Sequence, residues 1–403
     1  MTTARAQAAA TPGLSTELAV VVEPPFHVPR NPEELRLFLQ AALTLEHLTI
    51  PPYLTAMYTL HAGTNRPAFY AIRAVVLEEM LHMTLVANLL NAVGGTPLVA
   101  HSRFVTGYPA RLPYSRDKIP IALRHFGTEA LRTFLHIERP EYVAEPPGHP
   151  SVADDEGWTS IGQFYATIRT GLIRLTEELG EKALFTGDPG RQIGPEHFYN
   201  SGGEVFRVSD LSSALTAFRV VTEQGEGVSR TIYNTDDLLF GEAREPAHYF
   251  RFDELLQERR YGPHDTPGSG PTGPALDVDR AAVHPIDPGA KAAHYPPGSA
   301  VRQAADRFNE VYARLLCVLE DAFTKDPAAL RAAVPTMLEL RDLAERLYRN
   351  PHPDPVKRAM GLHASATYEI TDELFGRVRA LLAGRPPGAA AGGGLGVGEP
   401  YGL

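Results

Sequence analysis

The sequence predicts an all-α protein, a helical bundle with additional helices toward the C-terminus. Apolar residues recur at the three- and four-residue spacing of amphipathic helices through much of the chain between residues 31 and 260. Residues that begin or end helices flank several of these segments. Two Glu-x-x-His motifs lie among them, one from Glu79 to His82 and one from Glu245 to His248. Together these observations favour a bundle whose core contains a polar site.

The first expected helix begins after Asn31, which can act as N-cap, with Pro32 at the first helical position. Its apolar residues keep helical spacing as far as Leu60. Pro51 and Pro52 interrupt the pattern, and an interior proline costs a helix about 3 kcal/mol. We therefore expect a bend beside the polar site, with a simple helix break as the alternative.

The other helices of the bundle follow from the same spacing. The second runs from Arg66 to Ala92 and stops at the glycine pair 94–95, a common C-terminal signal. Further helices are expected within residues 121–141, 159–181, 210–224 and 243–259.

Changes in composition divide the chain further. A flexible arm is expected over residues 1–30, before the metal-binding bundle of residues 31–260. Residues 261–300 are rich in proline and glycine and form either a linker or a strap across the bundle. The C-terminal helices, residues 301–384, should pack on the bundle, with breaks at 325–327 and 349–355, and residues 385–403 have the composition of a disordered tail.

Charge and cysteine content exclude several classes of function. A net charge of -10 and an isoelectric point near 5.8 argue against binding to nucleic acid or to an anionic membrane. The single cysteine, Cys317, cannot form an internal disulfide or hold an iron–sulfur cluster alone. Because the sequence shows neither a signal peptide nor a transmembrane run, we expect a cytoplasmic protein. A homo-oligomer is compatible with these features.

The first Glu-x-x-His motif lies in a segment that is apolar on nearly all sides, VVLEEMLHMTLVANLL. Such a helix should be buried, and buried carboxylates are costly unless they are paired or bind a metal. Glu78 and Glu79 therefore need partners, and a cation is the expected one. Glu79 and His82 share a helix face, although Glu78 competes because it is four residues from His82.

Two further carboxylates complete a pattern of Glu, Glu-x-x-His, Glu, Glu-x-x-His. Carboxylate bundles that bind two metal ions use this combination. Glu223 competes with Glu226, which we prefer because Gly225 and Gly227 flank it. The predicted metal ligands are Glu46, Glu79, His82, Glu226, Glu245 and His248.

Carboxylates mixed with two imidazoles suit iron, with manganese as the second choice. Two such ions could react with dioxygen or peroxide and oxidise a small organic substrate, although the sequence singles out no catalytic residue. Tyr53, Tyr165 and Tyr249 are candidates to lie near the centre, but tyrosines in bundles are more often ordinary core residues.

Four segments, EHLTIPPYL, LEEMLHM, TEQGEG and the pattern E-x-A-H-Y-x-R-F, resemble the ferritin-like domain of iminophenyl-pyruvate dimer synthases and its stand-alone relatives. DVDRAAVHPIDP and FNEVYARLLCVLEDAF extend the resemblance to roughly residues 30–380. It departs at residues 366–370, where ATYEI replaces a Gly-Pro-x-Phe-Glu element, and this chain is much shorter than a full dimer synthase.

The resemblance implies a ferritin-like bundle in which the six residues above bind metal. It also implies an oxidase, oxygenase or oxidative coupling enzyme of secondary metabolism, without identifying the substrate. Two alternatives remain. One is a metal-handling protein such as a ferroxidase or manganese catalase, and the other is a binding module within a biosynthetic complex.

Overall fold

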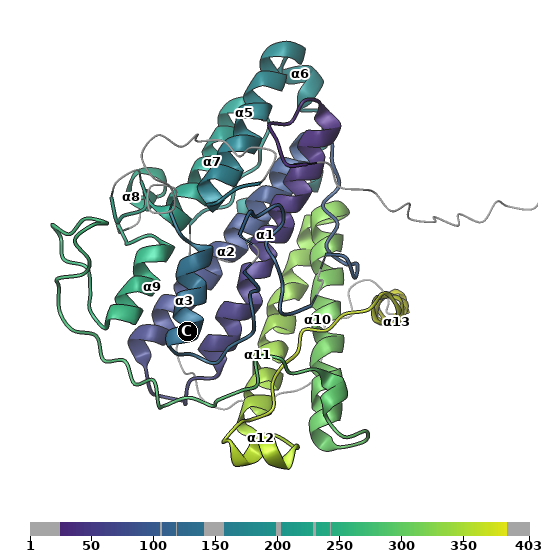
Figure 1. The fold of residues 1–403 in the computed structure, drawn as a ribbon. Helices are drawn as coiled ribbons and strands as arrows, with labels where there is room; N and C mark the ends of the chain where they lie inside the picture. The colour runs from purple at the N-terminus through teal and green to yellow at the C-terminus, as the bar shows by residue number, and fades with distance from the viewer. Residues whose placement is uncertain are drawn as a thin grey trace, which may run out of the picture.

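A computed structural model describes residues 25–104, 107–117, 119–140, 157–198, 203–228, 231–241 and 243–384. The expected arm lies outside these residues except for 25–30, and the expected tail of residues 385–403 lies wholly outside them. Within the described chain the regular structure is helical, and β pairing is limited to isolated bridges. The all-α prediction is confirmed. Element labels follow Figure 1.

Four long helices form the bundle: α1 (Pro32–Tyr58), α2 (Arg66–Ala92), α5 (Ile161–Leu179) and α7 (Leu211–Glu226). They pack in a ring, because α1 contacts α2 and α5, and α7 contacts α2 and α5. Two shorter helices, α3 (Thr128–Ile137) and α9 (His248–Gln257), pack on each other and continue the bundle beside α1 and α2 (Figure 1). Helices α1 and α2 therefore contact both pairs of helices: α1 packs against α5 and α3, and α2 packs against α7 and α9.

Helix α1 has the expected N-terminal cap, in which the Asn31 side chain accepts a hydrogen bond from the backbone N–H of Glu34. It continues through Pro51 and Pro52, so the alternative of a simple helix break is wrong. Pro52 cannot donate to the carbonyl of Leu48 four residues earlier. The hydroxyl of Tyr108 donates to that carbonyl instead, at 2.9 Å, which removes part of the cost of the proline.

Helix α9 begins later than expected, at His248 rather than near residue 243. Proline restricts the residue before it to extended backbone, and Pro246 forms an isolated bridge with Tyr233. Glu245 consequently lies outside the helix. The second Glu-x-x-His motif does not present its two side chains on one helical face.

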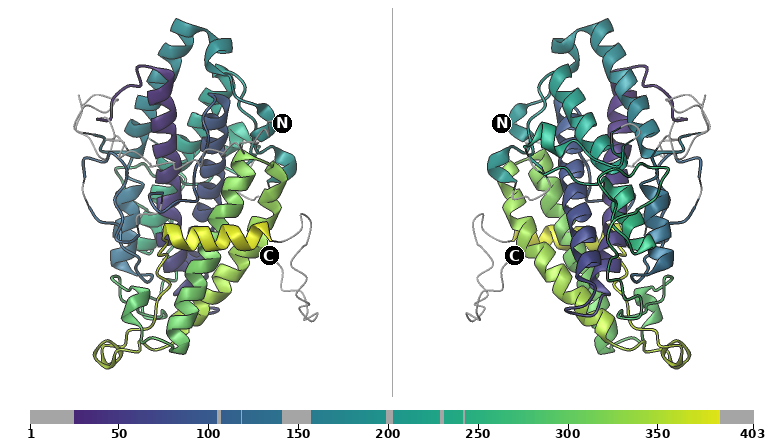
Figure 2. Two further views of the ribbon diagram at one scale, coloured as in Figure 1. Left: turned by 90° about the vertical axis from the view of Figure 1, so that its right-hand side faces the viewer. Right: turned by 90° about the vertical axis from the view of Figure 1, so that its left-hand side faces the viewer.

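The C-terminal part consists of α10 (Ala300–Thr324), α11 (Ala333–Arg349), α12 (Pro355–Ala359) and α13 (Asp372–Ala383). The expected breaks at residues 325–327 and 349–355 coincide with the ends of α10 and α11. Figure 2 shows α13 lying across α10. The shortest helices are α6 (Glu181–Leu184) and α8 (Asp236–Leu239), and 3-10 turns occupy Pro189–Arg191, Pro195–His197, Ala292–His294 and Pro327–Ala332.

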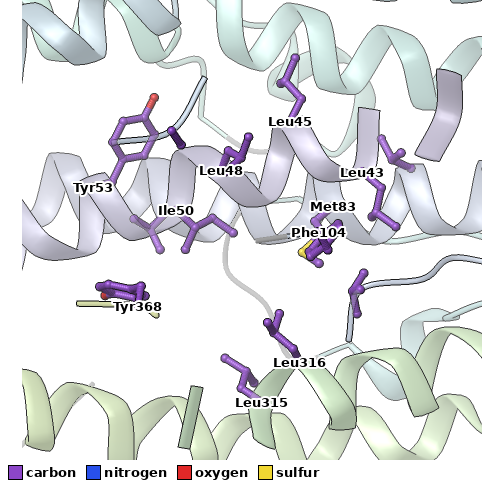
Figure 3. Packing of buried hydrophobic residues seen from close by; sticks show 14 of the residues in the cluster. Leu43, Leu45, Leu48, Ile50, Tyr53, Met83, Phe104, Leu315, Leu316 and Tyr368 are labelled. Atoms are coloured by element: carbon purple, nitrogen blue, oxygen red, sulfur yellow. The ribbon is translucent and has the colours of Figure 1, made fainter. Parts of the chain in front are cut away.

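One hydrophobic core joins the bundle to the C-terminal helices. Ile50 of α1 lies on the side that faces Leu315 and Leu316 of α10, whereas Leu45 points to the opposite side (Figure 3). The proline- and glycine-rich segment 261–300 follows α9 and leads into α10. Isolated bridges join it to the end of α1, through Val283 and Leu60, and to the segment before α13, through Ile286 and His363. The division into domains stays a prediction.

Candidate metal centre

Two groups of buried side chains could each hold a metal ion. One contains Glu46, Glu79 and His82, and the other contains Glu79, Glu138 and His248. Within each group the candidate ligand atoms lie within 4.8 Å of one another. Glu79 belongs to both groups, so the two sites share one carboxylate.

Each of these side chains has a definite origin in the fold. Glu46 lies in the middle of α1, and Glu79 and His82 lie one turn apart on α2. Glu138 is the residue directly after α3, and His248 is the first residue of α9. The two short helices therefore bring one ligand each to the middle of the bundle.

The shared carboxylate has its two oxygens turned toward different histidines. Glu79 Oε1 is 3.0 Å from His248 Nδ1, and Glu79 Oε2 is 3.9 Å from His82 Nδ1. The two imidazole rings are stacked, with centroids 5.5 Å apart. Glu79 could therefore serve as a ligand at both candidate positions, each of which also has one imidazole.

The two carboxylates that belong to one group only, Glu46 and Glu138, are called the outer carboxylates, and each accepts a hydrogen bond from a tyrosine. Tyr165 donates a hydrogen bond to Glu46 Oε1, and Tyr53 donates one to Glu138 Oε1. Their second oxygens face the imidazoles, since Glu46 Oε2 is 3.4 Å from His82 Nδ1 and Glu138 Oε2 is 3.5 Å from His248 Nδ1. Each tyrosine leaves one oxygen of its carboxylate free to bind an ion.

Burial and the neighbouring carboxylates raise the pKa of Tyr53 and of Tyr165 well above the ordinary value for a phenol, so both are hydrogen-bond donors at neutral pH. Tyr249, the third candidate of the sequence, makes ring contact with Phe250 and takes no part in either ligand group.

The electrostatics of the cluster call for a cation. Burial and the charge of Glu138 raise the pKa of Glu79 to about 8. Carboxylates at such short range cannot all ionise in a low-dielectric core without positive charge between them. His248 Nδ1 is buried and faces Glu79 and Glu138 at 3.0 and 3.5 Å; burial alone would lower the pKa of His248, but Glu138, Glu78 and Glu79 raise it well above its ordinary value. A metal ion fits both features, and oxygen ligands with two imidazoles suit iron or manganese.

The outward-facing nitrogens of both imidazoles also have partners. His248 Nε2 lies 2.7 Å from Glu78 Oε2, and His82 Nε2 lies 2.7 Å from Gln224 Oε1. Burial alone would raise the pKa of Glu78, but Arg251 beside it and the bond with His248 lower that pKa to about 2. Glu78 is therefore ionised and placed to orient His248, while Glu79 faces the centre.

Four of the six ligands expected from the sequence come together here: Glu46, Glu79, His82 and His248. The structure does not bring Glu226 or Glu245 into either group. Glu226 ends α7 and accepts a hydrogen bond from the backbone N–H of Gly162 in the first turn of α5, where the helix dipole favours an anion.

Glu245 is held away from the centre by the extended backbone before Pro246. Its side chain is 53% exposed and lies 3.3 Å from Arg251. The alternative Glu223 pairs with Arg219 and accepts a hydrogen bond from Thr235, also outside both groups.

Glu138 is the candidate ligand that the sequence reasoning missed. The buried face of α3 includes Leu131 and Phe134, and Glu138 follows them at positions i+7 and i+4. A carboxylate on the apolar face of a short amphipathic helix indicates a buried, and therefore a candidate ligand, side chain. Glu138 lies outside both Glu-x-x-His motifs, so those motifs alone do not identify it.

Within the part of the chain that the structure describes, no helix combines the length and apolarity needed to cross a lipid bilayer.

Comparison with known proteins agrees with this architecture. The model of a family described as ferritin-like matches residues 39–257, more than half of the chain. A ferritin-like protein from Caulobacter vibrioides shares the fold, with a TM-score of 0.53 and 24% identity over 81% of this chain and 97% of that one.

Two curated relatives match at the sequence level. Dichlorochromopyrrolate synthase of Lentzea aerocolonigenes is 28% identical over 302 residues, which is 70% of this chain and 28% of the relative. The 2-imino-3-(indol-3-yl)propanoate dimerase of Chromobacterium violaceum is 31% identical over 172 residues, 39% of this chain and 15% of the relative. The matched region thus spans less than a third of either relative. These findings confirm the resemblance drawn from the motifs.

Proposed function

Because the chain belongs to the ferritin-like family, we propose that it holds two iron ions and oxidises a small organic metabolite in secondary metabolism. Manganese is the alternative metal. The proposed ligands are Glu46, Glu79, His82, Glu138 and His248. The observation that carries this proposal is Glu79, whose two oxygens face two different histidines.

Two ions bound there would supply redox chemistry with dioxygen or peroxide. The protein's own contribution is to hold the ligands in place and to exclude water. All five residues are buried, with 3% or less of each exposed. Tyr53 and Tyr165 hold the outer carboxylates through one oxygen each. Thr49 donates a hydrogen bond to Glu79 Oε2 at 3.0 Å, which further limits the movement of the shared carboxylate.

The reaction class comes from the relatives. Their names describe a synthase and a dimerase, and the second names an imine of an indolyl propanoate as the molecule that is dimerised. Because the matched region is a minor part of both relatives, their complete reactions do not transfer to this chain. Oxidation or oxidative coupling of a small organic metabolite is the part of that chemistry that a two-metal centre can supply.

The first test measures how much iron the protein binds. We expect aerobically purified protein to hold close to two iron ions per chain, and the chelated protein to regain them from Fe(II) with a change in its optical spectrum. Uptake of many tens of iron ions per chain without an organic product would indicate storage instead. Rapid breakdown of peroxide without any organic substrate would indicate a catalase.

The second test uses the histidines. His82→Ala and His248→Ala should each abolish oxygen consumption that depends on extracts of the producing cell. Helix content should stay nearly unchanged, because each substitution removes a ligand from a large core. Full activity in either variant would exclude this centre as the reaction site.

A further inference from the structure

The two imidazoles of the proposed centre differ in what they contact on their outer side. His248 Nε2 faces a carboxylate, Glu78, and His82 Nε2 faces a neutral amide, Gln224, each at 2.7 Å. The inner surroundings match, since each Nδ1 faces the shared Glu79 and one outer carboxylate. The inner ligands are therefore of the same kind, and the difference in kind lies in the outer partners, although Glu79 Oε2 on the His82 side also accepts a hydrogen bond from Thr49.

The partner of His248 can only accept a hydrogen bond. Glu78 is held as a carboxylate by Arg251, whose Nη1 donates to Glu78 Oε1 at 2.8 Å. His248 must then carry its proton on Nε2 and donate it to Glu78. Nδ1, on the side of Glu79 and Glu138, is then the nitrogen left to bind an ion.

A second chain of contacts places a proton on His82 Nε2 as well. Gln224 Nε2 donates to Asp236 Oδ1 at 2.9 Å, and Asn234 donates to the other Asp236 oxygen at 2.6 Å. Since Asp236 only accepts, the amide of Gln224 must turn its oxygen toward His82. His82 donates from Nε2 as well, but to a neutral acceptor.

We propose that this difference makes the two metal positions unequal, so that the first ion occupies the Glu79, Glu138 and His248 position and the second occupies the Glu46, Glu79 and His82 position. The inference rests on the proposed function. A carboxylate that accepts the outer N–H of a ligating histidine raises the basicity of that ligand, and loss of such a partner typically costs 10–100-fold in metal affinity. Glu78 and Gln224 act as positioning residues through the imidazoles.

Two more distant charges reduce the difference in basicity between the two imidazoles. Arg251 offsets part of the charge of Glu78, and Asp236 adds negative charge behind Gln224. Each acts on its imidazole through an intervening side chain. The directly bonded acceptor therefore decides the order, because Coulomb interactions weaken with distance.

The experiment titrates chelated, full-length protein with manganese(II), with free ion followed by electron paramagnetic resonance and heat by calorimetry. We expect two binding steps in the wild type. His82→Ala should keep the tight step at its wild-type affinity, and His248→Ala should keep only a step that is 10–100-fold weaker than the tight one. Equal affinities in the two variants, or the reverse order, would overturn the inference.

Exchanging the outer partners tests the cause. Glu78→Gln should weaken the tight step about 10–100-fold. The double change Gln224→Glu with Asp236→Asn exchanges an acid and an amide, and should strengthen the weak step. Glu223→Gln is the matched control, because it removes a carboxylate next to Gln224 that contacts neither imidazole. A tight step that is unchanged in Glu78→Gln would contradict the assigned cause.

A measurement on the metal-free protein shows whether the outer partners orient the two imidazoles, independently of metal affinity. Nitrogen-15 spectra of histidine in the chelated protein should show a proton on Nε2 of both imidazoles, and an unprotonated Nε2 in either would overturn the argument. Failure of the folded wild type to bind any manganese(II) would defeat the proposed centre itself. Two bound ions filled in the reverse order would defeat only the present inference.

Discussion

At the scale of single residues, what decides whether a carboxylate reaches the centre is the local backbone that carries it. Glu138 follows α3 on its buried face, four residues after Phe134, and is 2% exposed. Glu245 precedes Pro246 on extended backbone, and its side chain is 53% exposed. Two glutamates of the same chemistry therefore have opposite surroundings.

Replacing each of these two glutamates by glutamine tests the assignment. We expect Glu138→Gln to hold about one fewer metal ion per chain, because one position loses an anionic ligand. Glu245→Gln should keep the wild-type metal content. Elemental analysis of both proteins after equal loading makes the measurement. Loss of metal in Glu245→Gln with retention in Glu138→Gln would reverse the assignment.

The raised pKa of Glu79 predicts how the metal-free protein responds to pH. In the folded state this pKa is about 8, against an ordinary value of 4.5, because of burial and the charge of Glu138. The folded protein thus holds a proton that the unfolded chain releases near pH 4.5. The stabilisation is complete below that pH and is lost as pH rises toward about 8.

Denaturation of chelated protein between pH 5 and 9 measures this effect. We expect the free energy of unfolding of the wild type to decrease with rising pH more steeply than that of Glu79→Gln, in which the titrating group is absent. With metal bound, the contribution of Glu79 to the pH dependence of the free energy of unfolding should disappear. Identical pH profiles for the two metal-free proteins would contradict the prediction.

At the scale of elements, α1 shows how a helix crosses two prolines while holding a ligand. Pro52 leaves the carbonyl of Leu48 without its helical donor, and the hydroxyl of Tyr108 replaces that donor. Leu48 lies between Glu46 and Thr49, both of which contribute to the centre. The contact therefore stabilises the part of α1 that carries the ligand.

Tyr108→Phe should reduce the free energy of unfolding by about 1–3 kcal/mol, the cost of a buried carbonyl left unpaired. The same change should cost less in a Pro52→Ala background, where a backbone N–H becomes available to Leu48. Urea denaturation of the four proteins forms a double-mutant cycle. Tyr70→Phe is the control, because Tyr70 is 55% exposed. Strict additivity of the two changes would argue against this role.

At the scale of the whole molecule, the bundle and the C-terminal helices share one hydrophobic core. Leu316 of α10 is fully buried in that core. Trp158, the single tryptophan of the chain, lies beside Phe164 of α5, with ring centroids 5.6 Å apart. Its fluorescence therefore reports on the bundle, while Leu316 tests the helices packed against it.

Leu316→Ala should destabilise the protein by about 2–5 kcal/mol, as expected for a truncated core leucine. If the two parts unfold together, Trp158 fluorescence and circular dichroism should shift to the same lower midpoint. Leu381→Ala serves as control, since Leu381 of α13 is 63% exposed. A fluorescence transition that stays in place while the helical signal splits would show that the two parts unfold separately.

The sequence by itself determined the helical architecture and the part of the site that lies within one helix, Glu79 and His82. Apolar spacing, the Asn31 cap and the glycines at 94–95 depend on short-range geometry, and they placed α1 and α2 with their ends. The motif from Glu79 to His82 could be read for the same reason, because two residues one helical turn apart share a face in any fold.

Only the tertiary structure decided which side chains complete the cluster. Glu138 comes from directly after α3, Gln224 from α7 and Glu78 from α2, and the packing of α3 and α9 against α1 and α2 depends on contacts far apart in the chain. The start of α9 at His248, after Pro246, separated a motif that looks continuous in the sequence. A ligand set assembled from separate helices is a property of their packing, so local spacing alone could not have determined it.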